Sequence, residues 1–377
     1  MSEQAPPTSQ PKPPPVSPEP APTKKGPIGR FLEKHGRKLW WLHSFWALVW
    51  GMLFMVLAGK GYSYSRFLLI SVCIVWVVIV LLFRFVGSGE DRRVDTKGQK
   101  VRFYAMTYVL KNLYQGMLFF LLPYYWQSST VGTPNFYFVV FLASCALVST
   151  LDIVFDNYLM KWKTIASGFY VFTLFACLNV ALPSILPDIA SIWTLLLAGV
   201  LSMAAFLLMH FPARLLREKV YISWLVAIIL VWLTSIYMVR KWIPPVPMYL
   251  THAAVGPALV TGETVEEEKG MVLEMEVKAL HRTVMDRDLF AITEVVAPGG
   301  LGEKLRHRWR QLGPNGATYG AGTVVLPTEK RGVVRVQSKL PIAKVKEHGE
   351  DTTGRWIVDV LTGDGRLVGR TGFRVTN

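Results

Sequence analysis

Residues 220–239 read VYISWLVAIILVWLTSIYMV, a stretch without a charged residue. An α-helix rises about 1.5 Å per residue, so about 20 apolar residues cross a hydrocarbon core of about 30 Å. Six more apolar stretches of this kind precede it along the chain. We place the seven predicted spans near residues 39–59, 67–86, 103–126, 136–157, 164–186, 190–211 and 220–239. The sequence therefore predicts a polytopic α-helical membrane domain of seven spans over residues 39–239.

The charges of the connecting segments give the predicted spans an orientation. Lysine and arginine gather before the first span and after the second, fourth and sixth, and are scarce in the loops between. The cationic residues include Lys34, Arg37, Lys38, Arg92, Arg93, Lys97, Lys161, Lys163, Arg214, Arg217 and Lys219. Because cationic loops stay on the cytoplasmic side, we expect a multi-pass protein of the bacterial inner membrane with a cytoplasmic N-terminus. Seven crossings then place the C-terminal domain in the periplasm.

The segments that flank the predicted membrane domain are rich in proline. Residues 1–38 contain too few apolar residues to form a core, so we expect a disordered, basic cytoplasmic tail. Residues 240–270, which include three prolines between 244 and 247, are predicted to be a linker. The chain has a formal net charge of +15, but residues 243–377 hold 18 Lys or Arg against 16 Asp or Glu. Because the excess lies in the tail and the membrane loops, we expect no nucleic-acid partner.

From about residue 271 the apolar pattern changes to a period of two, which is typical of β-strands. Alternating or β-branched runs occupy residues 272–277, 289–296, 305–311, 333–336, 356–361 and 367–375. The tetrapeptide Thr362-Gly363-Asp364-Gly365 is a hairpin turn signal, since glycine adopts the positive φ that such turns require. Several short strands at regular spacing predict an all-β, immunoglobulin-like sandwich over residues 271–377.

Short motifs in this region resemble a known family in their order and spacing. They are Ala297-Pro298, Gly300-Leu301, His307-x-Trp309, Gly313, Arg335, Ser338-Lys339, Gly354-x-Trp356, Val358-x-Val360, Gly365, Gly369-Arg370 and Phe373-x-Val375. The stretch resembles the bacterial domain of unknown function two-nine-one-four. The membrane part and the prolines after it resemble the companion family, domain of unknown function five-nine-two-four. One loop departs from the first family, because residues 329–334 replace its Gly-Gly-Arg and following aromatic residue. The resemblance implies a membrane-tethered β domain and supplies no activity.

Arg306, Arg308 and Arg310 alternate with His307 and Trp309 in one predicted strand. Successive side chains of a strand point to opposite faces, so the three arginines share a face. This row is a candidate binding face for an anionic glycan, a lipid head group or the carboxylates of an envelope protein. The alternative is a solvated outer face balanced by nearby acidic residues. We interpret His307 as a hydrogen-bonded core histidine, since no second His or Cys stands at metal-ligand spacing.

A second candidate site lies in the predicted membrane domain. Lys111 follows Arg102 by nine residues in span three, and Asp152 precedes Lys161 by nine residues in span four. The two charges are therefore expected at similar depth, where each alone would cost about 2.5–3.5 kcal/mol, so we predict an ion pair. Asn112 and Asp156 extend this polar cluster. The pair is either a functional site or a device that sets helix register.

The sequence contains none of the common catalytic or nucleotide-binding motifs, such as G-x-S-x-G, H-E-x-x-H or a P-loop. Its three cysteines lie in predicted spans, so we expect neither a disulfide nor a thiolate metal site, and no cofactor. The first functional hypothesis is a membrane-anchored periplasmic module that binds or senses an unknown ligand, in contact with membrane lipids and an envelope protein or glycan. The alternative is a transporter or proton-coupled carrier that uses the Lys111–Asp152 pair. An odd number of spans without an inverted repeat disfavours the carrier.

Overall fold

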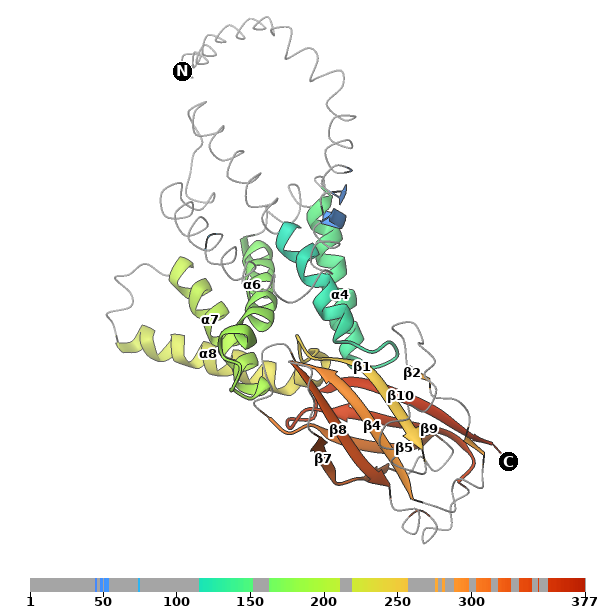
Figure 1. The fold of residues 1–377 in the computed structure, drawn as a ribbon. Helices are drawn as coiled ribbons and strands as arrows, with labels where there is room; N and C mark the ends of the chain where they lie inside the picture. Colours follow the sequence, from blue (N-terminus) through green and yellow to red (C-terminus); the bar gives the residue numbers. More distant parts are fainter. Residues whose placement is uncertain are drawn as a thin grey trace, which may run out of the picture. The chain divides into compact units, whose positions relative to one another are not determined.

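The computed structural model divides the chain into two units, Met1–His43 and Ser44–Asn377, and every residue that it describes lies in the second. The described residues are 115–151, 163–210, 219–256, 288–297, 303–312, 318–326, 332–340 and 352–376, with short pieces at 45, 48–49, 51–53, 74, 275–276, 280–281 and 345. Among the described residues, those before Tyr249 are mainly helical and those from Tyr249 onward mainly form β-sheets (Figure 1).

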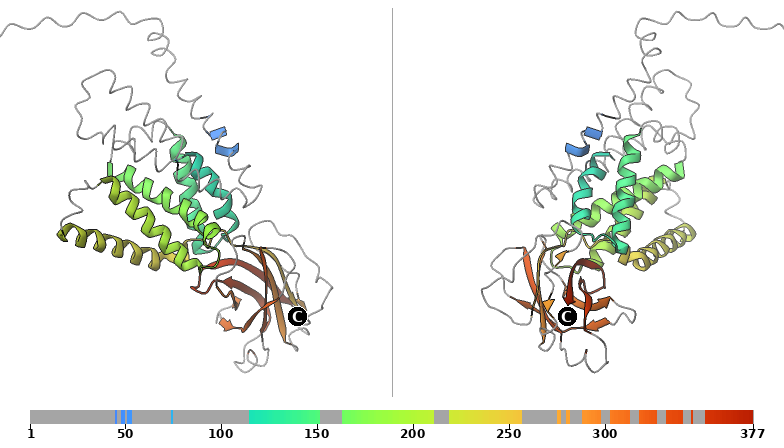
Figure 2. Two further views of the ribbon diagram at one scale, coloured as in Figure 1. Left: turned by 60° about the vertical axis from the view of Figure 1, so that its left-hand side comes forward. Right: turned by 90° about the vertical axis from the view of Figure 1, so that its right-hand side faces the viewer.

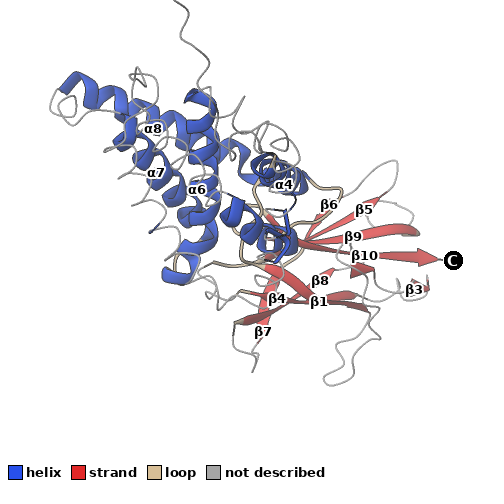
Figure 3. Ribbon diagram, turned by 90° about the horizontal axis from the view of Figure 1, so that it is seen from above, coloured by secondary structure: helices blue, strands red, loops and turns tan. Residues whose placement is uncertain are grey.

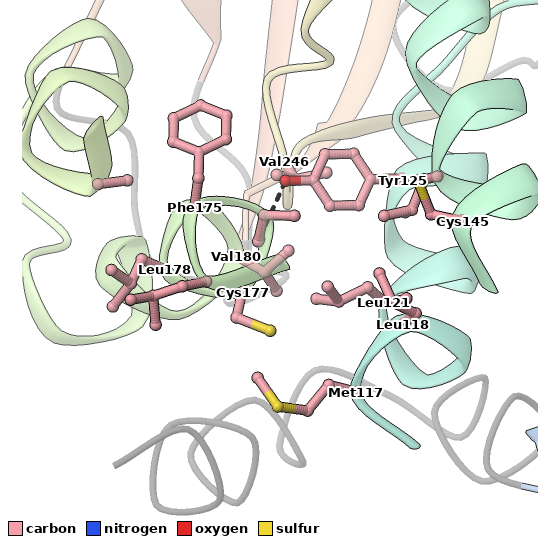
Figure 4. Close-up of a cluster of buried hydrophobic side chains, with 14 of the residues drawn as sticks. Met117, Leu118, Leu121, Tyr125, Cys145, Phe175, Cys177, Leu178, Val180 and Val246 are labelled. Carbon is pink, nitrogen blue, oxygen red and sulfur yellow. Dashed lines mark hydrogen bonds between the residues drawn. The ribbon is translucent and has the colours of Figure 1, made fainter. Parts of the chain in front are cut away.

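The first long described stretch of helix is residues 115–127. The helical part continues with α4 (Pro134–Thr150), α6 (Lys163–Ile185), α7 (Ser191–His210), α8 (Lys219–Val239) and the 3₁₀ helix η4 (Arg240–Trp242). Proline marks two of the boundaries. Pro134 occupies the first turn of α4, where its missing N–H costs nothing, and Pro187 lies just beyond the end of α6. Apolar side chains of residues 115–127, α4, α6 and α7 then form one hydrophobic cluster (Figure 4).

The predicted fold class, seven membrane spans joined to an immunoglobulin-like sandwich, is wrong. Among the described residues one helix, Lys219–Trp242, is long and apolar enough to cross a membrane. The apolar parts of the other helices are shorter: Pro134–Thr150, Gly168–Pro183 and Ser191–Leu207. Hydropathy reports apolar content and does not distinguish a lipid-facing helix from one that buries its side chains against other helices, as these do. The structure supports helices with one candidate span, followed by two antiparallel sheets.

Helix α8 differs from its neighbours in how little of it is covered. Only 6 % of its most apolar window is buried. Its main buried contact is Ile236, which lies against Gly199 of α7, where an added Cβ would come within 2.5 Å of the Ile236 Cδ1. The Trp232 indole N–H also donates to the Gly199 carbonyl at 3.2 Å. One narrow stripe of α8 therefore packs on α7, and most of its surface faces away from the described protein.

The β part consists of two sheets, which Figures 2 and 3 show as separate layers. Sheet A has the order β1-β4-β8-β7, and sheet B has the order β2-β10-β9-β5-β6, with β3 also pairing with β10. The strands are β1 (Tyr249–Gly256), β2 (Met275–Glu276), β3 (Leu280–His281), β4 (Leu289–Val296), β5 (Arg306–Leu312), β6 (Thr318–Gly320), β7 (Thr323–Leu326), β8 (Val333–Leu340), β9 (Gly354–Leu361) and β10 (Leu367–Thr376). The long strands pair antiparallel, while β2 and β3 join β10 in parallel.

The core between the sheets is built around aromatic rings from sheet B. Trp309 and Trp356 are fully buried, and Phe373 contacts both, edge-on to the first and stacked on the second. Leu289 and Leu340 of sheet A complete this cluster. The Trp356 indole N–H donates to the Thr352 carbonyl at 2.9 Å, which satisfies its one polar group.

Strand β1 lies inside residues 240–270, the stretch predicted to be a linker. Seven of its residues pair with β4, so the prolines lead directly into sheet A. Its Leu250 also reaches across to sheet B, where Gly369 of β10 leaves room for it. A Cβ at Gly369 would lie 2.6 Å from the Leu250 Cβ. The β domain therefore begins at Tyr249, upstream of the predicted boundary at residue 271.

The predicted hairpin turn is confirmed and joins β9 to β10. Gly365 has φ +86, the Gly365 N–H donates to the Thr362 carbonyl at 3.0 Å, and the Thr362 N–H donates to the Arg366 carbonyl at 2.9 Å. We call residues 362–366 the β9–β10 turn.

Candidate functional site

The two sites predicted from the sequence fall in different parts of the chain. The predicted intramembrane cluster, Lys111, Asn112, Asp152 and Asp156, lies outside the described residues. The arginine row of β5 lies within them. Arg306 is exposed, and the side chains of Arg308 and Arg310 are 43 % and 28 % exposed on the outer face of sheet B.

A buried carboxylate, Asp359, lies at the centre of this arginine row. It stands on β9 directly opposite Arg308 on β5 and Arg370 on β10. The Arg308 Nη2 donates to its Oδ2 at 2.9 Å, and the Arg310 Nη2 lies 2.8 Å from the same oxygen. The Arg370 Nε donates to Oδ1 at 2.7 Å. Three guanidinium groups from two strands therefore converge on one fully buried carboxylate, and we call these four residues the Asp359 cluster.

The sequence pattern of β5 identifies Arg308 and Arg310 as neighbours on one face, but not the carboxylate on which they converge. Asp359 lies in the run Trp356–Leu361, whose other members are apolar. A single carboxylate in such a run is a recognisable signal, because a buried charge needs a partner. The partners of Asp359 depend on the pairing of β5 with β9. Arg308 and Asp359 are 51 residues apart in the sequence.

The outer face of sheet A holds a smaller charged group. Arg335 of β8 lies opposite Glu294 of β4, and its Nε donates to the Glu294 Oε1 at 3.1 Å. Farther along the same strands, the Lys339 ammonium lies 2.6 Å from the Asp288 carboxylate. Arg335, one of the family-motif residues, is thus a partner of a single carboxylate.

His307 and Trp309 point inward from β5 and lie in a polar network between the sheets. The His307 Nε2 lies 2.8 Å from the Thr293 Oγ1, and its Nδ1 lies 2.7 Å from the Ser338 Oγ. The Trp309 indole N–H donates to the same Ser338 oxygen at 3.0 Å. All these groups are satisfied when Ser338 donates to Nδ1 and the Nε2–H donates to Thr293. The network links β5 of sheet B to β4 and β8 of sheet A.

The proximity of Ser338 to His307 resembles a nucleophile beside a base, but both residues are buried in the core. Burial lowers the pKa of His307 from its ordinary value of 6.5 to about 4, so the imidazole is neutral at physiological pH. No substrate reaches these atoms in the folded domain. The pair is therefore a core hydrogen bond and not a catalytic dyad.

A further polar site, which no sequence pattern predicted, lies where the helices meet the β9–β10 turn. The Glu303 Oε1 accepts hydrogen bonds from the backbone N–H and the hydroxyl of Ser191, the first residue of α7. The Glu303 Oε2 accepts from the Gly363 N–H at 3.0 Å. A carboxylate at a helix N-terminus also interacts favourably with the helix dipole. Glu303 therefore joins α7 to the turn.

Arg366 lies at the centre of this junction and is fully buried. Its Nε donates to the Asp364 Oδ2 at 2.9 Å, and the charge of Glu303 lies close enough to act on it. Burial lowers the pKa of the guanidinium below its ordinary value, while Asp364 and Glu303 oppose that shift. Tyr125 also lies close by. Its hydroxyl donates to the Ala176 carbonyl at 3.0 Å (dashed line in Figure 4).

Two further hydrogen bonds fasten the hairpin to the helices. The Asn135 side-chain amide, at the start of α4, donates to the Leu367 carbonyl at 3.1 Å. The Arg240 Nε, in η4, donates to the Asp364 carbonyl at 3.4 Å. Helices α4, α7 and η4 therefore all interact with the same hairpin, α7 through Glu303. The Thr-Gly-Asp-Gly pattern predicts the turn itself, but its helical partners, up to 232 residues away, leave no local signal.

The described residues contain no group of three or more His, Cys, Asp or Glu placed to hold a metal ion. Cys145 and Cys177 are buried free thiols of the helical cluster, and Cys73 lies outside the described part.

Comparison with known protein families matches residues 26–283 to the family described as Family of unknown function (DUF5924). The match covers more than half of the chain and extends through the helices and β1 to β3. It confirms the resemblance to domain of unknown function five-nine-two-four, and it does not extend to most of residues 271–377. No curated protein and no solved structure matches this chain.

Proposed function

We propose that this chain, which belongs to the family of unknown function DUF5924, is a membrane-anchored module that binds or senses a ligand through its β domain. The observation that carries the proposal is the exposure of α8. Trp224, Val231 and Met238 are 66 %, 68 % and 71 % exposed. An apolar surface of this length marks an interaction with a membrane or an apolar partner, and its length fits a bilayer.

The end of α8 supports a β domain held close to the membrane surface. α8 runs into η4, where Trp242 is a residue type that favours the membrane–water interface. Arg240 reaches the β9–β10 turn through Asp364. The chain then enters β1 after only a few residues. These contacts hold the β domain close to the end of α8.

We place the anchor in the bacterial inner membrane and the β domain on its periplasmic side. Arg214, Arg217 and Lys219 precede α8 and favour a cytoplasmic start. Arg240, at the other end, lies over the Tyr237 ring at 4.0 Å and donates to the Tyr237 carbonyl at 2.7 Å. The resemblance of residues 271–377 to domain of unknown function two-nine-one-four is consistent with a β domain attached to a membrane part.

The sensing role rests on the junction. Strands β9 and β10 carry Asp359 and Arg370 on the outer face of sheet B, and their shared turn contacts α7 through Glu303 and η4 through Arg240. A ligand that changes the pairing of β5, β9 and β10 therefore acts on the same hairpin that the helices hold.

Reporter fusions at both ends of α8 test the anchor. Alkaline phosphatase is active only outside the cytoplasm and green fluorescent protein fluoresces only inside it. A phosphatase fused after Asn377 is expected to be active and a fluorescent protein there dark, while fusions after Arg217 give the reverse. The same reporter state at both positions would show that α8 does not cross the membrane and would overturn the proposal.

A further inference from the structure

The Asp359 cluster carries more positive charge than its own carboxylate neutralises. Arg308 and Arg310 share the Asp359 Oδ2, and Arg370 takes Oδ1. One arginine suffices to balance a buried aspartate, and Arg308 and Arg310 each carry more N–H donors than this arrangement uses. Arg308 and Arg310 therefore bring two guanidinium charges to a single carboxylate oxygen.

The geometry of the donors leaves part of two guanidiniums unused. The Arg308 Nε and Arg310 Nε are buried and have no hydrogen-bond partner among the described residues. The outer parts of both side chains remain exposed, at 43 % and 28 %. A planar fork of this kind binds phosphate and carboxylate oxygens in pairs.

The surrounding face adds further positive charge. Arg306 and Arg374 are exposed on the same outer face, and Arg374 lies directly opposite Arg355 across β9 and β10. Gly320, opposite Arg308 on β6, has no side chain to cover the guanidinium.

We propose that Arg308, Arg310 and Arg370, organised by Asp359, form a binding site for a phosphate-type oxyanion. A phosphate monoester carries about −1.5 to −2 at pH 7 and offers three acceptor oxygens, so it suits the adjacent guanidiniums of Arg308 and Arg310 better than a single carboxylate does. Asp359 keeps the three guanidiniums converged in the absence of ligand, which lowers the ordering cost of binding. This inference rests on the proposed function and names the ligand class of the β domain.

The position of the site makes a signal to the helices feasible. Asp359 lies three residues before the β9–β10 turn, about 10 Å along the strand, and Arg370 lies a similar distance beyond it. The source of the phosphate is either a lipid head group at the membrane surface or a soluble phosphate ester. Both present the same oxygens to the arginines, so the test has one arm for each.

The soluble arm uses the full-length protein in a neutral detergent. Inorganic phosphate is titrated at constant ionic strength, with chloride as the balancing anion, and the unfolding midpoint is followed, because a ligand of the folded state raises it. Arg308→Gln/Arg310→Gln is expected to weaken phosphate affinity at least tenfold, and Arg308→Lys to weaken it less. The matched control is Arg335→Gln, which removes an arginine of equal exposure from the outer face of sheet A and is expected to change the affinity less than twofold.

The lipid arm uses the same proteins in nanodiscs of phosphatidylcholine, with or without phosphatidic acid. Stabilisation by phosphatidic acid that the double variant loses identifies a lipid source, and stabilisation by inorganic phosphate alone identifies a soluble one. Absence of both effects in the wild type, or equal losses in the double variant and in Arg335→Gln, overturns the site. The reporter fusions test the membrane anchor separately, since a phosphate site on a chain that does not cross the membrane would still bind phosphate in these titrations.

Discussion

The outer faces of the two sheets neutralise a buried carboxylate in different ways. Each holds a carboxylate on an otherwise largely apolar strand, Glu294 on β4 and Asp359 on β9. Glu294 pairs with Arg335 across one strand boundary, whereas Asp359 collects three arginines from two neighbouring strands. The first arrangement is what neutralising a buried charge requires. The second exceeds it, and the surplus arginines are the basis of the proposed oxyanion site.

The inner faces do not share this difference. His307 spans them, with Thr293 and Ser338 on sheet A as its partners. Stability therefore depends on a network common to both sheets, while ligand recognition is assigned to one outer face. The predictions below separate these two contributions.

The largest effect is expected when the centre of the cluster loses its charge. Asp359→Asn leaves three guanidiniums without their counter-charge and is expected to lower the free energy of unfolding by about 3–5 kcal/mol. Glu294→Gln, the equivalent change on sheet A, is expected to cost less, since it leaves fewer arginines uncompensated. Chemical denaturation of the full-length protein in detergent measures both. Equal losses of unfolding free energy would show that the two carboxylates contribute equally to stability.

Lowering the pH is expected to reduce stability through His307 of the inner network, and not through the different charge arrangements of the two outer faces. The unfolded His307 takes up a proton near pH 6.5, whereas the folded one does so only near pH 4. Stability is therefore full above pH 6.5 and falls as the pH drops from 6.5 toward 4, by about 3 kcal/mol in all. His307→Asn should be less stable at neutral pH but should lose this pH-dependent part. If the variant lost the same stability between pH 6.5 and pH 4, groups other than His307 would be responsible for that loss.

The sheets should also differ in how they respond to loss of one arginine. Arg335→Gln leaves the buried Glu294 carboxylate without that donor and is expected to cost about 1–2 kcal/mol. Arg308→Gln leaves Asp359 with Arg310 and Arg370 and relieves repulsion among like charges, so a change within about 0.5 kcal/mol is expected. Thermal unfolding of both variants at low and high salt makes the comparison. A larger cost for Arg308→Gln than for Arg335→Gln would contradict the idea of surplus charge.

Local patterns predicted what depends on neighbouring residues. The alternation from Arg306 to Gln311 gives the two faces of β5 because side-chain direction in a strand has a period of two. The Thr-Gly-Asp-Gly turn follows from the backbone freedom of glycine. Neither pattern contains the long-range pairing that brings Asp359 to Arg308, so the centre of the cluster was not identified.

The helical part shows where such patterns mislead. Seven stretches have the composition of a span, but composition is the same whether a helix faces lipid or other helices. Residues such as Leu142 and Leu195 are buried among neighbouring helices, while Val231 of α8 is not. The junction was missed for the reason that hid Asp359, because Glu303 and Ser191 meet only in the folded chain.

The smallest effect is expected at Glu303, a carboxylate whose hydrogen bonds come from Ser191 and Gly363. Glu303→Gln keeps an oxygen to accept these bonds and removes the charge at the start of α7, so a cost of about 0.5–1 kcal/mol is expected. The same unfolding measurements provide the comparison with Asp359→Asn. If the two losses were equal, the number of converging guanidiniums would not explain the sensitivity of sheet B. A small loss at Glu303 beside a large one at Asp359 assigns that sensitivity to the arginines themselves.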